Sequence, residues 1–168
     1  MRLTKALFDE CEVIHVNALN IESCDDCKYC NHVAGCKFKH DEMPKLIDKI
    51  KQANTLVIAS PIYFGALTDQ LLKVINRFQQ FFSAKFTLDA PYPEVQSLFF
   101  VNTCGADNNT MFDGAKLTMN ILASLLNAEH KFQFTMQNTD HLSKNDEKKI
   151  IKDYKIQLKR GCKEMNLK

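Results

Sequence analysis

Hydrophobic residues along the chain form short continuous runs, which are separated by segments with a helical repeat. The runs at residues 55–60 and 97–103 are almost wholly apolar, which is typical of strands covered on both faces of a sheet. A run rich in β-branched residues at 12–17 and a final run at 131–136 predict two further strands. The pattern therefore predicts four strands.

Between these runs, apolar residues recur at the three- and four-residue spacing of helices. Asp41 can cap one such helix, with Pro44 inside the first turn, where a missing N–H is tolerated. We expect helices at residues 2–10, after Asp41 with Leu46, Ile47 and Ile50 on its apolar face, at 67–78, from 108 or 109 to 126, and from about 143 to 165. In the last helix we expect four residues to face the core: Ile150, Ile151, Tyr154 and Leu158.

The alternation of strands and helices predicts an α/β three-layer sandwich with a mostly parallel sheet. We expect residues 1–168 to form a single domain of this class. In such sheets, ligands bind in the loops beyond the carboxyl ends of the strands. Three segments occupy that position, at residues 18–40, 60–65 and 103–109, and we expect them to cluster at one edge.

Composition and charge exclude several classes of protein. The chain has 22 basic and 20 acidic side chains, and its net charge of +2 is too small for a dedicated nucleic-acid binder. Its apolar runs are far shorter than the ~20 residues that cross a bilayer. The beginning of the chain lacks the pattern of a secretory signal, and we expect a cytoplasmic protein without membrane attachment.

The seven cysteines are the most informative residues of the composition. Four of them lie close together in the loop at 18–40: Cys24, Cys27, Cys30 and Cys36. An odd total without export argues against a disulfide framework. Four thiolates suit a [4Fe–4S] cluster or a tetrahedral zinc ion, and the tight spacing favours the cluster. A thiol-rich loop without any metal is the third interpretation.

Two further loops carry candidate chemistry. The first comprises Ser60, Pro61, Ile62, Tyr63, Phe64 and Gly65, and the second comprises Thr103, Cys104 and Gly105. Exposed amides beside an aromatic side chain suit a flat heteroaromatic ligand. The alternative is an ordinary turn, with Tyr63 and Phe64 packed in the core and Cys104 as a small buried residue.

Taken in order, these motifs resemble the NAD(P)H-dependent FMN reductase family, which is flavodoxin-like in fold, and in particular its iron–sulfur flavoprotein branch. The family shares a C-x2-C-x2-C-x5-C loop, matched at the four clustered cysteines, and an S-P-[IV]-Y-[FW]-G loop, matched at residues 60–65. Asp41-Glu42-Met43, Leu72-Lys73 with Asn76-Arg77, and Thr103 with Gly105 match further family positions.

The resemblance implies that residues 60–65 and 103–105 line the ring of bound FMN and that NAD(P)H is the electron donor. It also implies a [4Fe–4S] cluster on the four cysteines and a homodimer. Electrons would pass from reduced nicotinamide through FMN, and a nearby cluster would let the protein split this two-electron donation into single steps. No nucleophile or general base is expected. Arg77 could neutralise a phosphate or an acidic partner, or lie solvated at a helix end.

Two departures from the family pattern bear on these expectations. The family opens with a hydrophobic strand and a Gly-Ser-x-Arg-type turn that cradles the FMN phosphate, whereas Met1 lies in what resembles the following helix. We therefore expect a sheet without the usual first strand and a phosphate site without its main donors. Asp26 replaces a usual glycine, and the acidic pair Asp25-Asp26 would lower a cluster's potential.

The alternatives to the flavin enzyme are a non-enzymatic iron–sulfur or zinc-binding module and a truncated member that no longer binds flavin. Such a remnant could dimerise through the sheet edge that the first strand would cover, since uncovered edges tend to find a partner.

Overall fold

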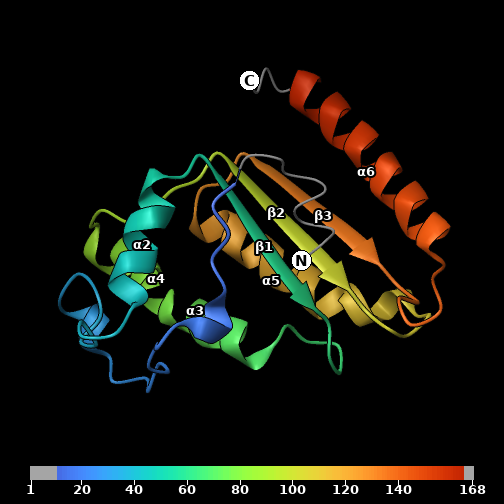
Figure 1. Ribbon diagram of the computed structural model, residues 1–168. Coiled ribbons are helices and arrows are strands. Elements are labelled where there is room, and N and C mark those ends of the chain that lie inside the picture. Colours follow the sequence, from blue (N-terminus) through green and yellow to red (C-terminus); the bar gives the residue numbers. More distant parts are fainter. Residues whose placement is uncertain (1–10, 165–168) are drawn as a thin grey trace.

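A computed structural model of the chain describes the backbone of residues 11–164 and the side chains of residues 11–157. Three strands form a parallel sheet in the order β1 (Thr55–Pro61), β2 (Ser97–Thr103) and β3 (His130–Met136) (Figure 1). The predicted α/β class and parallel sheet are confirmed. The register pairs Ser60 with Asn102 and Asn102 with Thr135, so the carboxyl ends of the strands lie side by side.

Five helices of this part of the chain surround the sheet. They are α2 (Met43–Gln52), α3 (Asp69–Arg77), α4 (Gln79–Ser83), α5 (Asp113–Leu125) and α6 (Lys144–Glu164). The N-cap of α2 is Glu42 rather than the predicted Asp41; Asp41 precedes it, and its Oδ1 accepts a 3.0 Å hydrogen bond from the amide of Met43. Shorter helical segments are η1 (Val16–Ala18), η2 (Tyr29–Asn31), η3 (Ala84–Leu88) and η4 (Asn109–Phe112). The sequence analysis did not predict α4 and η3, which continue the course of α3.

The sheet is covered on its two faces by different helices, which gives the expected three layers. On one face, Ile58, Leu98 and Phe100 join the apolar side chains of α2, α3 and α5 in the larger core. On the other face, Phe99 and Phe134 join a second cluster that includes the inward side of α6. Figure 1 shows α5 and α6 on either side of the strands. Tyr154 of α6 packs edge-on against Phe134 with a centroid distance of 4.8 Å.

One prediction of secondary structure is wrong, and another lies outside the described residues. Residues 12–17 form no strand, and the amide of Ala18 instead bonds to the carbonyl of His15 to begin η1. Extended backbone becomes a strand only where it forms a ladder of hydrogen bonds with a neighbour, and the edge strand β1 pairs with β2 alone. β1 is also less covered than predicted, since Ala59 is exposed. The helix expected at 2–10 is not among the described residues.

None of the helices within residues 11–164 is long and apolar enough to cross a membrane.

Candidate functional site

The loops that follow β1 and β2 meet directly at the carboxyl edge of the sheet. The amide of Ile62 donates a 2.7 Å hydrogen bond to the carbonyl oxygen of Thr103. The buried side chain of Asn102 supports the same corner, since its Nδ2 donates to the carbonyl of Ser60 at 3.3 Å. The structure therefore brings together the two loops that the sequence predicted to lie side by side.

The first of these loops ends in a tight aromatic turn. Tyr63 and Ala66 exchange two backbone hydrogen bonds of 3.0 Å, and the two residues between them have positive φ angles, 53° at Phe64 and 74° at Gly65. Positive φ at both central positions defines a type I′ turn. A large residue such as phenylalanine rarely adopts this conformation. The turn thus holds Phe64 in a strained backbone state, a feature that concentrates at functional sites.

Both aromatic side chains of this turn face solvent. Tyr63 is 62% exposed and Phe64 is fully exposed, so the alternative in which they pack in the core is wrong. Within residues 11–164, the amides of Phe64 and Gly65 donate to no acceptor. Exposed aromatic faces beside unused N–H groups can stack against a planar ring and hydrogen-bond its polar edge.

Several candidate residues of the two loops lie beneath this surface. Ser60, Ile62 and Cys104 are buried. The Ser60 hydroxyl donates to the carbonyl of Pro61 and accepts from the amide of Thr68 at 3.2 Å, which links the end of β1 to the start of α3. Burial raises the pKa of the Cys104 thiol, whose Sγ lies 3.2 Å from the carbonyl oxygen of Ala106. These side chains are placed to support the loops rather than to contact a ligand from outside.

Two glycines at this edge are closely approached. A Cβ on Gly105 would collide with the carboxylate of Asp140, from the loop between β3 and α6. The family resemblance implies that Gly105 lines the flavin ring, and in this structure the carboxylate of Asp140 lies beside its backbone. A Cβ on Gly114, at the start of α5, would lie 2.5 Å from the carbonyl oxygen of Gly65. The aromatic turn is therefore seated against α5.

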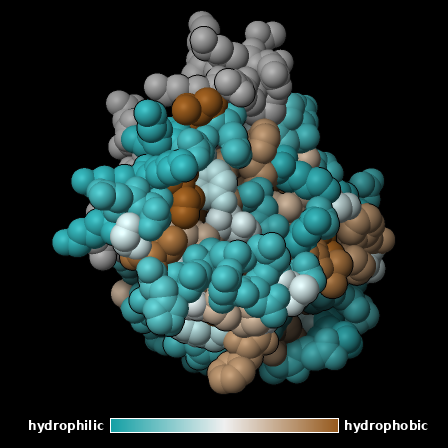
Figure 2. Space-filling view, turned by 90° about the vertical axis from the view of Figure 1, so that its right-hand side faces the viewer, coloured by the Kyte–Doolittle hydropathy of each residue, from teal (hydrophilic) through white to brown (hydrophobic). Residues whose placement is uncertain are grey.

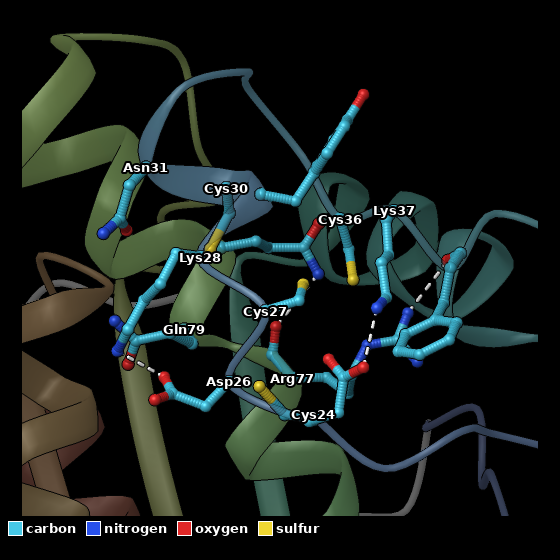
Figure 3. A pocket seen from close by; sticks show the side chains of 14 residues that line it. Cys24, Asp26, Cys27, Lys28, Cys30, Asn31, Cys36, Lys37, Arg77 and Gln79 are labelled. Atoms are coloured by element: carbon cyan, nitrogen blue, oxygen red, sulfur yellow. Dashed lines mark hydrogen bonds and ion pairs between the residues drawn. The ribbon is translucent and has the colours of Figure 1, made fainter.

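All four clustered cysteines line a pocket that is separate from the aromatic turn (Figure 3). Cys24 and Cys27 are exposed, Cys30 and Cys36 are half-buried, and none of the four is in a disulfide. Ser83 of α4 supports the loop, because its Oγ lies 2.8 Å from Asn31 Oδ1 and 3.4 Å from Cys30 Sγ. The cavity between these residues has a volume of about 30 Å³. Among the residues that the structure describes, no group of three or more His, Cys, Asp or Glu side chains is close enough to hold a metal ion.

Charged pairs surround these thiols. Lys37 Nζ lies 2.6 Å from Asp25 Oδ2, and Lys28 Nζ lies 2.5 Å from Asp26 Oδ1. The hydrogen bond from Lys37 lowers the pKa of Asp25, with a further contribution from the thiol of Cys27. The pKa of Lys28 is raised chiefly by Asp26. Each aspartate of the acidic pair is thus matched by a lysine, so the expected excess of negative charge beside the cysteines is compensated.

Arg77, the last residue of α3, is buried beneath the cysteine loop. Its side chain is 1% exposed and pairs at 2.5 Å with Asp41, whose side chain is 4% exposed. Nη1 also donates to the carbonyl of Glu22 at 2.8 Å, and Nη2 donates to the carbonyl of Phe38 at 3.0 Å. Both expectations for Arg77, a solvated side chain and a neutraliser of a phosphate or an acidic partner, are wrong. The one sequence signal for this buried pair was that Asp41 and Arg77 both match positions of the same family pattern.

The cysteine loop and the aromatic turn lie at opposite ends of α3 (Figure 1). The loop after β1 leads into Asp69, whereas Arg77 contacts the cysteine loop. α3 has 9 residues, which corresponds to roughly 12 Å along its axis. The expectation that three segments cluster at one edge is therefore correct for the loops after β1 and β2 and wrong for the cysteine loop.

Comparison with curated proteins finds relatives of this chain. An iron-sulfur flavoprotein of Archaeoglobus fulgidus is 33% identical over 73 residues, which amount to 44% of this chain and 35% of that protein. The chain therefore matches about a third of the length of this relative.

Two solved structures share the fold. A flavone reductase superposes with a TM-score of 0.60 at 18% identity, over 90% of this chain and 54% of that chain. An NADH:FMN oxidoreductase in its apo form superposes with a TM-score of 0.54 at 12% identity, over 93% of this chain and 78% of that chain.

The profile of one protein family, described as NADPH-dependent FMN reductase, matches residues 2–110. This match covers well over half of the 168 residues and includes the cysteine loop, β1, the aromatic turn and β2. The chain belongs to the NADPH-dependent FMN reductase family.

Proposed function

We propose that the protein is a flavin-dependent oxidoreductase that transfers electrons from reduced nicotinamide through FMN. The observation that carries this proposal is the aromatic turn at the carboxyl edge of the sheet. There, the exposed rings of Tyr63 and Phe64 stand beside unused amides, next to the loop that begins at Thr103. Open α/β sheets bind their ligands at this edge, and family membership supports FMN as the ligand.

In this proposal the residues around the turn hold the flavin ring, and other residues support them. The ring-binding set is Pro61, Tyr63, Phe64, Gly65, Thr103 and Gly105, while the buried Ser60, Ile62 and Cys104 support the loops from below. When bound, FMN supplies the acceptor for the hydride of NADH or NADPH. The protein contributes stacking by the aromatic rings and hydrogen bonds from the amides of Phe64 and Gly65. Asp140 must move aside or share the space if the ring approaches Gly105 closely.

We propose further that Cys24, Cys27, Cys30 and Cys36 are the ligands of a [4Fe–4S] cluster. The donor set fits this group, because four unbridged thiols line one pocket and clusters of this kind are held by four thiolates. Lys28 and Lys37 line the same pocket. Binding would draw the four sulfurs together, since metal binding commonly completes the folding of its own site.

The distance between the two sites favours a second candidate function, a metal-binding module that works without flavin. The cysteine pocket is complete without any residue of the aromatic turn, and α3 separates the two. A zinc-binding or iron–sulfur module of this kind would use the same four thiols. It would also leave Phe64 without a ligand.

The assembly and location of the protein are part of the same proposal. We propose a single-domain cytoplasmic homodimer with small-molecule partners and no nucleic acid. Several large apolar side chains of the described surface are exposed, which supports self-association. These are Phe82, Phe86, Leu117 and Ile121. Figure 2 shows hydrophobic residues interspersed on an otherwise largely hydrophilic face.

The test is anaerobic purification followed by a visible spectrum, analysis of iron, sulfide and zinc, and an assay of NADH and NADPH oxidation after addition of FMN. We expect bound flavin and turnover, with turnover reduced in Phe64→Ala but not in Val13→Ala, an exposed control outside both proposed sites. Failure to bind FMN or to oxidise either nicotinamide would reject the oxidoreductase. Zinc in place of iron and sulfide, in a protein without flavin, would select the metal-binding module.

A further inference from the structure

A single guanidinium group joins the two ends of the cysteine loop. Glu22 precedes Cys24 in the sequence, and Phe38 follows Cys36. Arg77 donates to the carbonyl oxygens of both flanking residues, at 2.8 Å to Glu22 and 3.0 Å to Phe38. All four cysteines are therefore carried on a segment whose ends are bonded to the same side chain.

The carboxylate of Asp41 balances this buried charge and extends the connection. Oδ2 of Asp41 accepts from Arg77 and, at 3.0 Å, from the amide of Glu22, while Oδ1 accepts from the amide of Met43. Burial alone would raise the pKa of Asp41, but these hydrogen bonds hold it below its ordinary value. The loop, the end of α3 and the start of α2 are thus tied at one buried point.

The rest of the cysteine loop has weaker attachments. Cys24 and Cys27 are exposed, and the ion pairs of Lys28 and Lys37 connect residues within the loop itself. Ser83 supports its middle through Asn31 and Cys30. Arg77 also lines the cavity that the cysteines surround (Figure 3). The buried connection at the loop ends is therefore well placed to decide whether the thiols stay together.

We propose that Arg77 is a positioning residue for the cysteine-bound cluster: by holding Glu22 and Phe38 together, it keeps the four thiols in one pocket before iron binds. This inference rests on the proposed assignment of the cysteines as cluster ligands. Groups that orient metal ligands commonly change metal affinity 10- to 100-fold when they are mutated. Lysine cannot replace arginine here, because an ammonium group lacks the planar fork that reaches two carbonyls at once.

The experiment compares Arg77→Lys with Val74→Ala in the full chain. Val74 is 4% exposed on the preceding turn of α3, so its truncation weakens the same helix without touching the loop. Metal-free proteins are reconstituted anaerobically with ferrous iron and sulfide at a temperature at which both variants are folded. We expect Arg77→Lys to retain iron roughly 10-fold less tightly than the parent, with loss of the visible cluster bands, and Val74→Ala to match the parent.

Hydrogen exchange of the metal-free proteins gives a readout that is independent of the cluster. We expect faster exchange across residues 23–37 in Arg77→Lys and unchanged exchange there in Val74→Ala. If Arg77→Lys is insoluble, the double variant Arg77→Gln/Asp41→Asn, which removes both buried charges, is used with the same expected result. Iron retention and exchange equal to the parent in the arginine variant would overturn the proposal, as would an equal loss of iron in Val74→Ala.

The same samples separate this inference from the proposed function. Flavin binding and nicotinamide oxidation by the parent without any iron uptake would overturn the role of Arg77 and leave the flavin function standing. Iron uptake that depends on Arg77 in a protein that binds no flavin would support the inference and reject the oxidoreductase.

Discussion

The carbonyl oxygen of Gly65 lies against Gly114, so close that a Cβ at position 114 would be only 2.5 Å away. This approach seats the aromatic turn on the start of α5. Gly114→Ala should push the turn outward and lower the free energy of unfolding by about 1–3 kcal/mol, the usual range for overpacking. Urea unfolding measures the loss, and flavin titration should show weaker binding. Lys116→Ala, an exposed change two residues later, should alter neither.

The strained backbone of Phe64 predicts a conflict between stability and binding. Asparagine adopts positive φ more readily than phenylalanine, so Phe64→Asn should unfold no more easily than the parent. Loss of the ring should weaken FMN binding by about 2- to 12-fold, which corresponds to the ~0.5–1.5 kcal/mol of a good aromatic contact. Fluorescence titration with FMN and thermal unfolding test the two halves separately. Parent-like FMN affinity in this variant would remove Phe64 from the proposed site.

Acid should weaken the connection between Asp41 and Arg77. The pKa of Asp41 is lower in the folded protein than its ordinary value of 3.8, so the carboxylate stabilises the fold above that value. This stabilisation is lost as the pH falls through the lower, folded pKa. Urea unfolding between pH 3 and pH 7 should show a steeper acid loss in the parent than in Asp41→Asn.

The same variant also tests the size of the interaction at neutral pH. Asp41→Asn should lose about 3 kcal/mol or more, because it leaves the guanidinium of Arg77 buried without its counter-charge. Neutralisation of an exposed carboxylate gives the comparison, and Asp48→Asn on α2 serves this purpose. A similar acid profile for Asp41→Asn and the parent would contradict the assignment.

The hydroxyl group of Tyr154 adds two hydrogen bonds to the apolar contacts between α6 and the sheet. Tyr154 donates to the carbonyl of Thr135 and accepts from its amide at 3.0 Å. Tyr154→Phe should lower the free energy of unfolding by about 1–3 kcal/mol, because it leaves both backbone groups without this partner. Hydrogen exchange should show greater loss of protection in α6 than in α5. Uniform loss across both helices would argue against this local role.

The cysteines should differ in reactivity according to their exposure. Cys24 and Cys27 are exposed, whereas Cys104 is buried with a raised pKa. Iodoacetamide at pH 8 should therefore alkylate Cys104 roughly tenfold or more slowly than the two exposed thiols in the metal-free folded protein. Peptide mass spectrometry measures each rate, and the difference should disappear in urea. Prior loading with the cluster should protect the loop cysteines and leave Cys104 unchanged.

The strands of the sheet could be predicted from sequence almost to the residue, and the reason is local. The runs that became β1, β2 and β3 are apolar because each strand contributes to a core. Residues 12–17 have the same β-branched character, but a strand also requires a neighbour, and the local sequence does not supply that information. The loops after β1 and β2 followed from the strands, because parallel strands end at a common edge.

The parts of the site that sequence did not predict depend on contacts between distant residues. Arg77 is buried because it bonds to the backbone carbonyls of residues 22 and 38 and to the carboxylate of residue 41. Any residue can supply a backbone carbonyl, so the sequence pattern does not reveal these partners. The same contacts fix the position of the cysteine loop at the far end of α3. The expectation that this loop lies close to the aromatic turn was therefore wrong. The exposure of Phe64 arises from two adjacent positive φ angles, whereas an aromatic residue near a strand usually suggests a core position.

The pairing of Asp41 with Arg77 has an evolutionary consequence. A change at either position alone would leave an unpaired charge buried in the interior. A shorter or less branched cation than arginine could not bond to both carbonyl groups. Sequences that keep the cysteine motif should therefore preserve aspartate and arginine at these two positions jointly, or lose both in the same lineage.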